Sequence, residues 1–494
     1  MPTTRDAYIA AFRFGLGEAS LEAVGADPRG WLLSQVGPAD PPARAVRNAE
    51  DVLADRHRVH KLARELKRSR KAAAQDPGQM AMAPDGADPN MGPTKAAKKV
   101  IRASDAGKDS VDLNQATRDD RYIRLRTALG TGRPFAEHLV WFWANHFTVS
   151  AAKGKARGLV GSFERDAIRP HIAGTFEAML RASTTHPAML QYLDNQHSAG
   201  PNSPHVQRAR GGYRTDKNVD KVRGLNENLA RELMELHTLG VARNDGSAAY
   251  SQADVTAMAA VLTGWRPPQD VPGQRARPLF DASWHEPGSK QVMGRSLPEG
   301  PGALDEALHM LATHPATARH VCARMARHFV ADEPPPALVE RMVSAWQRSG
   351  GQLTQVTQAM VTAPEAWVST AAKLRTPEEF AVCSLRMLGQ TGESVAVAAD
   401  AGIVGMGQEV QSAPSPAGWP ERSEEWLGPE AMWTRVEWAQ QLSRRLGGHQ
   451  DARAIARQAL GEGLSERTAR QISQAADGEQ ALTMLLLAPE IQRR

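Results

Sequence analysis

Helix-forming residues fill the intervals between the glycine and proline breaks of this chain of 494 residues. Alanine, leucine, arginine, glutamate and glutamine dominate these intervals, and β-branched runs with a period of two are scarce. The first group suits helices, whereas alternating β-branched residues are typical of strands. The sequence therefore predicts an all-α fold: a large multi-helix body with a long basic helix and a disordered insertion, rich in proline, glycine and methionine, near the N-terminus.

Changes in composition along the chain predict four regions. N-terminal helices at 1–55 pack on the main body, and a basic helix with a flexible insertion occupies 56–118. A central helical domain with the candidate site covers 119–370, and a C-terminal helical region covers 371–494. The insertion is predicted to be disordered because Gln75–Thr94 lacks periodic apolar residues and is rich in turn formers.

The segment PFAEHLVWFWANHFTVS, residues 134–150, is apolar almost all round. This pattern predicts a buried helix at the centre of the molecule, with proline in the tolerated first turn. The helix ends in the polar pair Asn145–His146, and buried polar groups need partners. Two interpretations of His146 stay open: a core histidine bonded to a backbone carbonyl, or a residue of a functional site.

Charge, cysteine content and hydropathy exclude several classes of protein. The formal net charge is only +5, and much of the basic excess falls between Arg56 and Arg102, so nucleic-acid binding is not expected. Cys322 and Cys383 lack metal-ligand spacing and are predicted to be core residues. No apolar run approaches the roughly 20 residues of a membrane span, and the N-terminus lacks the apolar core of a signal peptide. The sequence thus predicts a cytoplasmic protein.

The densest set of chemically capable side chains lies in Leu225–Val241, LNENLARELMELHTLGV. At about 100° per residue, a helix here places Asn228, Glu232 and Glu235 on one arc, with Arg231 at its edge. These four side chains are the candidate catalytic residues. Two carboxylates one helical turn apart suit a divalent metal or general acid–base catalysis.

Other residues of the same segment complete the prediction. Asn226 is the expected N-cap and Gly240 the expected end of the helix. His237 falls away from the carboxylate arc, so it would serve a different neighbour. The loop that contains His285, WHEPGSK, is predicted to cover the site or to form a surface hairpin. The candidate metal ligands are His146, Glu232, Glu235, His237 and His285.

A second interpretation of this segment needs no ligand. Glu227, Arg231 and Glu235 follow each other at intervals of four with alternating charge. This spacing is typical of a solvated helix face with intrahelical ion pairs.

Several motifs, taken together and in order, give the chain a family resemblance. They are FRFGLG near the start, HLVWFWANHFTVS, HPAMLQYLDN, LNENLARELMELHTLGV, the stretch ending VLTGW, HEPGSK, HPATARHV, KLRTPEEF and AGWP. With them the chain resembles the bacterial family of domain of unknown function 1800 along nearly its whole length, least at 56–119. The resemblance implies recurrent polar positions at Asn145, His146, Asp194, Asn195, Asn226, Glu227, Asn228, Arg231, Glu232, Glu235, His237, Asp254, His285 and Lys290.

The resemblance also implies a cellular context. Many members look exported and are often encoded beside a sulfatase- or phosphatase-like protein, whereas this chain lacks a recognisable export signal. A periplasmic location is then expected only if an exported partner carries the protein. Two functional hypotheses follow: a metal-assisted enzyme of hydrolysis or oxidation with a bound divalent ion, and a non-catalytic helical protein that binds or escorts the sulfatase- or phosphatase-like partner.

Overall fold

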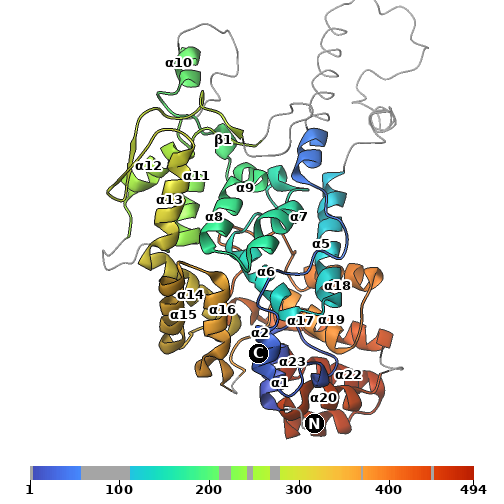
Figure 1. The fold of residues 1–494 in the computed structure, drawn as a ribbon. Coiled ribbons are helices and arrows are strands. Elements are labelled where there is room, and N and C mark those ends of the chain that lie inside the picture. Colours follow the sequence, from blue (N-terminus) through green and yellow to red (C-terminus); the bar gives the residue numbers. More distant parts are fainter. Residues whose placement is uncertain are drawn as a thin grey trace, which may run out of the picture.

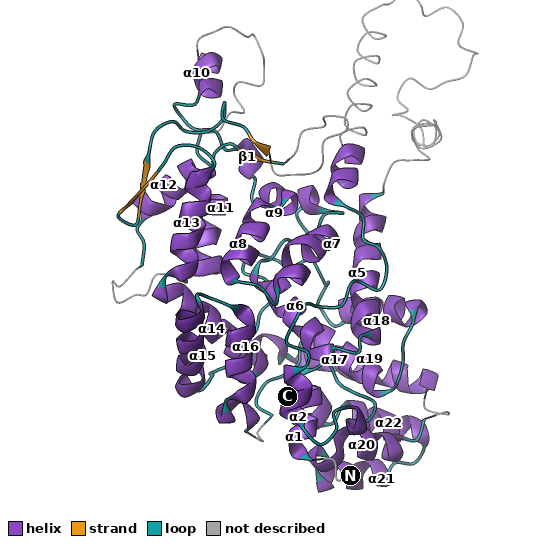
Figure 2. Ribbon diagram, in the orientation of Figure 1, coloured by secondary structure: helices purple, strands orange, loops and turns teal. Residues whose placement is uncertain are grey.

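The computed structural model describes residues 4–56, 112–210, 224–241, 249–267, 279–368, 371–446 and 450–494. Helices dominate these residues (Figure 1 and Figure 2), which confirms the all-α prediction. Residues 49–56 are helical. The expected basic helix beyond residue 56 and the expected insertion at Gln75–Thr94 lie outside the described residues, and the division into four regions stays a prediction.

The first half of the described chain consists of helices and of short π- and 3₁₀-helical segments, labelled η. They are α1 (Arg5–Ile9), η1 (Ala10–Phe14), η2 (Leu21–Ala23), α2 (Pro28–Leu33), α5 (Leu113–Gly130), α6 (Pro134–His146), η5 (Gly154–Ala156), α7 (Val160–Phe163), η6 (Glu164–Ile168), η7 (Arg169–His171), α8 (Phe176–Thr185), α9 (Pro187–Tyr192), η8 (Asn195–His197), α10 (Pro204–Arg210), α11 (Asn228–Glu232), η10 (Leu233–Thr238) and α12 (Gln252–Leu262).

Two small antiparallel sheets separate this half from the remaining helices. Strand β1 (Trp265–Arg266) pairs with β2 (Leu279–Phe280), and β3 (Lys290–Val292) pairs with β4 (Arg295–Leu297). The helices that follow are α13 (Gly302–Thr313), α14 (Pro315–Phe329), α15 (Pro336–Ser349), α16 (Leu353–Thr362), η11 (Pro364–Trp367), α17 (Pro377–Met387), α18 (Glu393–Gly405), η12 (Ser423–Trp426), α19 (Pro429–Leu446), α20 (Ala452–Leu460), η14 (Gly461–Gly463), α21 (Glu466–Ser473), α22 (Gly478–Leu486) and α23 (Pro489–Gln492).

Helix α6 lies near the centre of the molecule (Figure 1). Its side chains are buried on all sides from Pro134 to Trp143, as the apolar pattern predicts. The buried apolar residues around it, from Ala7 to Ile491, form one hydrophobic cluster. Among the described residues, no helix combines the length and the apolar character that crossing a membrane requires.

Local signals in the sequence explain where the helices that matter for the site begin. Ser251 and Asp254 form the expected capping box at the start of α12, and Thr376 and Glu379 form another at the start of α17. In each box two side chains satisfy backbone N–H groups that the first helical turn leaves without partners. The side chains in the first turn of α17 are thereby fixed in direction.

Three short segments, η1, η6 and η10, are π-helical. A π-helix uses i→i+5 hydrogen bonds, as in the bond from Leu239 N to Met234 O at the end of η10. The wider turn changes the angle between successive side chains. Angular positions calculated for a regular α-helix therefore do not hold in these segments.

Candidate functional site

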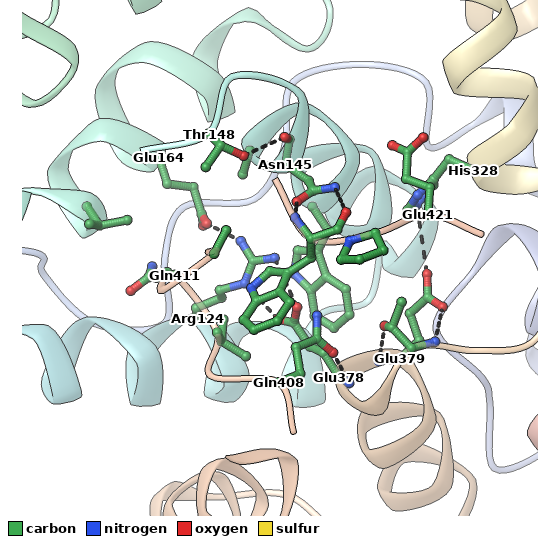
Figure 3. Close-up of a pocket in the computed structure, with 18 of the residues that line it drawn as sticks. Arg124, Asn145, Thr148, Glu164, His328, Glu378, Glu379, Gln408, Gln411 and Glu421 are labelled. Carbon is green, nitrogen blue, oxygen red and sulfur yellow. Dashed lines mark hydrogen bonds and ion pairs between the residues drawn. The ribbon is translucent and has the colours of Figure 1, made fainter. Parts of the chain in front are cut away.

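A cavity of about 80 Å³ lies where α5, α6 and α17 meet residues 408–421. Its volume is enough for several water molecules. Figure 3 shows Arg124 and Glu164 on one side, His328, Glu379 and Glu421 on the other. Trp141 and Trp419 supply aromatic surface. Apolar lining with a few converging polar groups is the usual composition of a ligand site.

Asn145, at the end of α6, fastens the loop that closes one wall of the cavity. Its side-chain amide donates to Trp419 O at 3.0 Å, and its side-chain oxygen accepts from Trp419 N at 2.8 Å. Asn145 O accepts from Thr148 Oγ1 at 2.6 Å. The polar end of the apolar helix is thus paired with the AGWP motif of residues 417–420.

Replacing Gly418 with alanine is expected to lower the free energy of unfolding by about 1–3 kcal/mol. Gly418 has a φ of +89°, and a Cβ there would lie 2.5 Å from Asn145 Oδ1 and 2.6 Å from Asn145 O. Chemical denaturation would measure the loss. Gly428→Ala is the matched control, because a Cβ at Gly428 has nothing within 4 Å. Equal stability of the two variants would show that the AGWP loop is not fixed in this way.

Buried ion pairs link the cavity wall to its surroundings. Arg124 Nε donates to Glu378 Oε1 at 2.8 Å, and Arg124 also bonds Glu164. Arg169 in turn joins Glu164 and Glu137 at 2.9 and 2.6 Å. Burial raises the pKa of Glu378 in spite of the nearby Arg124 charge. This side of the cavity is therefore a network of charges removed from water.

Two histidines and a glutamate converge on the other side. The three atoms His138 Nε2, His328 Nε2 and Glu379 Oε1 all lie within 4.8 Å of one another. His138 Nε2 is 3.2 Å from His328 Nε2 and 3.2 Å from Glu379 Oε1, and His328 Nε2 is 3.9 Å from Glu379 Oε1. We call these residues the His–His–Glu centre. His328 and Glu379 also line the cavity, so the centre borders it.

Backbone contacts set the direction of two members of the centre. His138 Nδ1 lies 2.8 Å from Phe14 O, in the π-helical segment η1. A carbonyl oxygen can only accept, so Nδ1 carries the hydrogen of the neutral ring and Nε2 keeps its lone pair. Glu379 Oε2 accepts from Thr376 N at 2.9 Å in the capping box, which leaves Oε1 to face the histidines. The motifs FRFGLG, HLVWFWANHFTVS and KLRTPEEF therefore meet at this point.

Cationic side chains lie around the His–His–Glu centre. Arg494 Nη2 forms an ion pair with Glu379 Oε1 at 2.8 Å, and Arg494 Nη1 donates to His138 Nε2 at 3.0 Å. Lys373 Nζ donates to Asp332 Oδ1 at 2.9 Å. Arg494 is brought there by backbone pairing, because Arg494 N donates to Lys373 O at 2.9 Å.

Burial and charge fix the protonation of the His–His–Glu centre. Burial and the Arg494 charge lower the pKa of His138 and hold that of His328 well below its usual value. Burial alone would raise the pKa of Glu379, but the Arg494 charge holds this pKa well below its usual range. The centre thus consists of two neutral imidazoles and an ionised carboxylate, the protonation state in which these groups bind metals.

The candidate carboxylates of Leu225–Val241 lie elsewhere. Glu232 and Glu235 are half-buried, and burial together with the Glu235 charge raises the pKa of Glu232. Asn228 is exposed, and its N–H donates to the side-chain oxygen of Asn226, the expected cap. Arg231 pairs with Glu227 at 3.1 Å, as the interpretation of a solvated face predicts.

The candidate histidines fall into two places. His146 and His237 do meet: His146 Nε2 lies 3.1 Å from His237 O, and the ring centres are 6.3 Å apart. His320 joins them, with its ring centre 6.3 Å from that of His146. We call these three residues the histidine cluster. His285 instead bonds Thr263 O at 2.8 Å and Lys290 Nζ at 2.9 Å, beside the end of α12.

The residues that the structure brings together are mostly ones that the sequence reasoning missed. Among the described residues, the His–His–Glu centre is the one group of three possible ligands within 4.8 Å, and it contains none of the candidate ligands. His138 is a polar residue within the apolar helix α6. Glu379 carried a capping-box signal, and His328 lies in an ordinary amphipathic helix, so neither pointed to a site.

Comparisons with known proteins place the chain in a family but add no function. No curated protein and no solved structure matches it. The family model described as "Protein of unknown function (DUF1800)" matches residues 9–493, nearly the whole chain and all three residues of the His–His–Glu centre. The protein therefore belongs to the DUF1800 family.

Proposed function

We propose that this protein is a metal-dependent hydrolase whose divalent cation binds to the His–His–Glu centre. The observation that carries the proposal is the convergence of His138 Nε2, His328 Nε2 and Glu379 Oε1 at the wall of a cavity. These atoms come from three helices, α6, α14 and α17, that are far apart in sequence. All three side chains are buried, where unpaired lone pairs are costly and ligand bonds are strong.

The spacing of the three atoms suits a tetrahedral ion. Bonds of about 2.1 Å at tetrahedral angles place neighbouring ligand atoms about 3.4 Å apart. The observed separations are 3.2, 3.2 and 3.9 Å. Two imidazole nitrogens and one carboxylate oxygen favour zinc over magnesium or calcium, which prefer oxygen ligands. The same donor set, with a fourth position left open, is used by catalytic zinc sites.

The cavity supports hydrolysis over a purely structural ion. Structural zinc sites are closed by a fourth protein ligand, whereas catalytic sites keep room for water and substrate. Here His328 and Glu379 border a space for several water molecules. A bound cation would lower the pKa of a water molecule and polarise an ester or amide. Glu378, whose pKa is raised, is then suited to hold a proton during the reaction.

Metal content tests the proposal. We expect purified full-length protein, stripped with a chelator and reloaded with zinc, to retain about one ion per chain. The variants His138→Ala, His328→Ala and Glu379→Gln should lose it, since three protein ligands are the usual minimum for such a site. Elemental analysis gives the stoichiometry, and a panel of p-nitrophenyl phosphate, sulfate and acetate esters tests for metal-dependent hydrolysis.

Matched controls come from the residues first considered as ligands. His146→Ala and Glu232→Gln should keep the ion, because neither residue belongs to the His–His–Glu centre. Reloaded protein without a stoichiometric ion would contradict the proposal. It would favour the second hypothesis, a non-catalytic binding or escort protein whose polar groups only fix the helix packing.

A further inference from the structure

The guanidinium of Arg494 contacts two of the three ligand atoms of the His–His–Glu centre. Nη1 donates to His138 Nε2 at 3.0 Å, and Nη2 pairs with Glu379 Oε1 at 2.8 Å. Nη2 also donates to His328 O at 2.7 Å. Arg494 is 3 % exposed, so this arrangement is removed from water and specific in geometry.

We infer that Arg494 is a built-in competitor of the metal ion, so that docking of its guanidinium and loading of the centre exclude each other. This inference rests on the proposed function. Arg494 and the metal ion need the same two atoms. His138 Nε2 and Glu379 Oε1 are bonded to Arg494, and both would have to act as ligands of the ion. A lone pair directed at an N–H group cannot also be shared with a cation.

Repulsion between like charges adds to the competition for the two ligand atoms. A guanidinium stays protonated even when buried, so an ion and the docked arginine would place like charges within a few ångströms in a medium of low dielectric. Loading the centre therefore requires the guanidinium to turn away from Glu379. Two other carboxylates, Asp332 and Glu421, already act on the Arg494 charge.

The contacts of Arg494 stabilise the His–His–Glu centre when no ion is bound. Without a cation, two neutral imidazoles and a carboxylate buried together would leave lone pairs unsatisfied, which is costly. Arg494 satisfies two of them. The consequence is that the protein binds its ion more weakly than the three ligands alone would allow, and that ion binding is coupled to movement of Arg494.

Zinc titration by calorimetry of chelator-treated full-length protein tests the competition. Arg494→Met keeps an unbranched apolar stem but removes the guanidinium donors, and is expected to bind zinc about tenfold or more tightly than wild type. Arg494→Lys keeps the charge without the fork that reaches two acceptors. Its affinity should fall between the two. Arg493→Met is the matched control, since Arg493 is half-buried and donates to Ala372 O away from the centre.

The outcomes separate this inference from the proposal on which it rests. Tighter binding by Arg494→Met, or by Arg494→Lys if the methionine variant does not fold, supports the competition. Equal affinities in wild type and all folded variants would overturn the competition and leave the metal site standing. An absence of zinc binding in every protein would overturn both.

Discussion

Replacing Arg169 with methionine is expected to lower the free energy of unfolding by about 3–5 kcal/mol. Arg169 pairs with both oxygens of Glu137 at 2.6 and 2.9 Å and with Glu164 at 2.9 Å. Glu137 is only 1 % exposed, so without the guanidinium its carboxylate would remain in the interior with no cation beside it. Chemical denaturation monitored by circular dichroism measures the loss.

An exposed ion pair of the same chemistry provides the control. Arg181 pairs with Asp305 at 2.6 Å, but both side chains are about half exposed. Arg181→Met should therefore cost less than about 1 kcal/mol, because water screens the charges and solvates the remaining carboxylate. Similar losses in the two variants would contradict the view that the interior around Glu137 is dry.

The fold was predictable because its signals are local. Helix α6 is buried all round because its sequence is apolar all round, and the Ser251–Asp254 capping box follows from residue types at a fixed spacing. Proline at the start of α6 and a positive φ of +87° at Gly240 likewise match local expectations. Such features depend on neighbours within one or two helical turns, which the sequence displays directly.

The His–His–Glu centre was not predictable because its signals are not local. In the sequence, His138 is separated from His328 by 190 positions and from Glu379 by 241 positions. Only the packing of α6, α14 and α17 brings them together. Glu379 also had a sufficient local explanation as the third residue of a capping box. In the structure one carboxylate oxygen makes the cap and the other faces the histidines.

In Leu225–Val241, the side-chain directions predicted for a regular α-helix do not hold along the whole segment. The α-helical part ends at Glu232, and Leu233–Thr238 is π-helical. A rotation of about 100° per residue therefore does not apply between Glu232 and Glu235. The three π-helical segments also contribute to the polar interior: Phe14 O in η1 faces His138, Glu164 in η6 pairs with Arg124, and His237 O in η10 faces His146.

Acidification from pH 7 to pH 5 is expected to lower the free energy of unfolding by about 2 kcal/mol through His237 alone. Burial and the Arg324 charge lower the pKa of His237 to about 3 and hold that of His146 well below its usual value. Below a pH of about 6.5 the unfolded chain protonates His237 while the folded protein does not, so stability falls as the pH falls. His146 acts in the same direction. Denaturant titrations at both pH values, in the presence of a chelator, measure the difference.

His237 separates this effect from general acid sensitivity. Among the described residues neither of its ring nitrogens has a hydrogen-bond partner, so His237→Leu removes a buried polar ring without leaving another group unpaired. The variant should unfold at pH 7 with a free energy close to or above that of wild type, and should lose about 2 kcal/mol less between pH 7 and pH 5. Phe147, whose ring centre lies 5.1 Å from that of His237, is the matched control. Phe147→Leu should be destabilised equally at both pH values, because phenylalanine does not titrate. If His237→Leu kept the full wild-type loss on acidification, the buried ring would be protonated in the folded protein and its lowered pKa would be refuted.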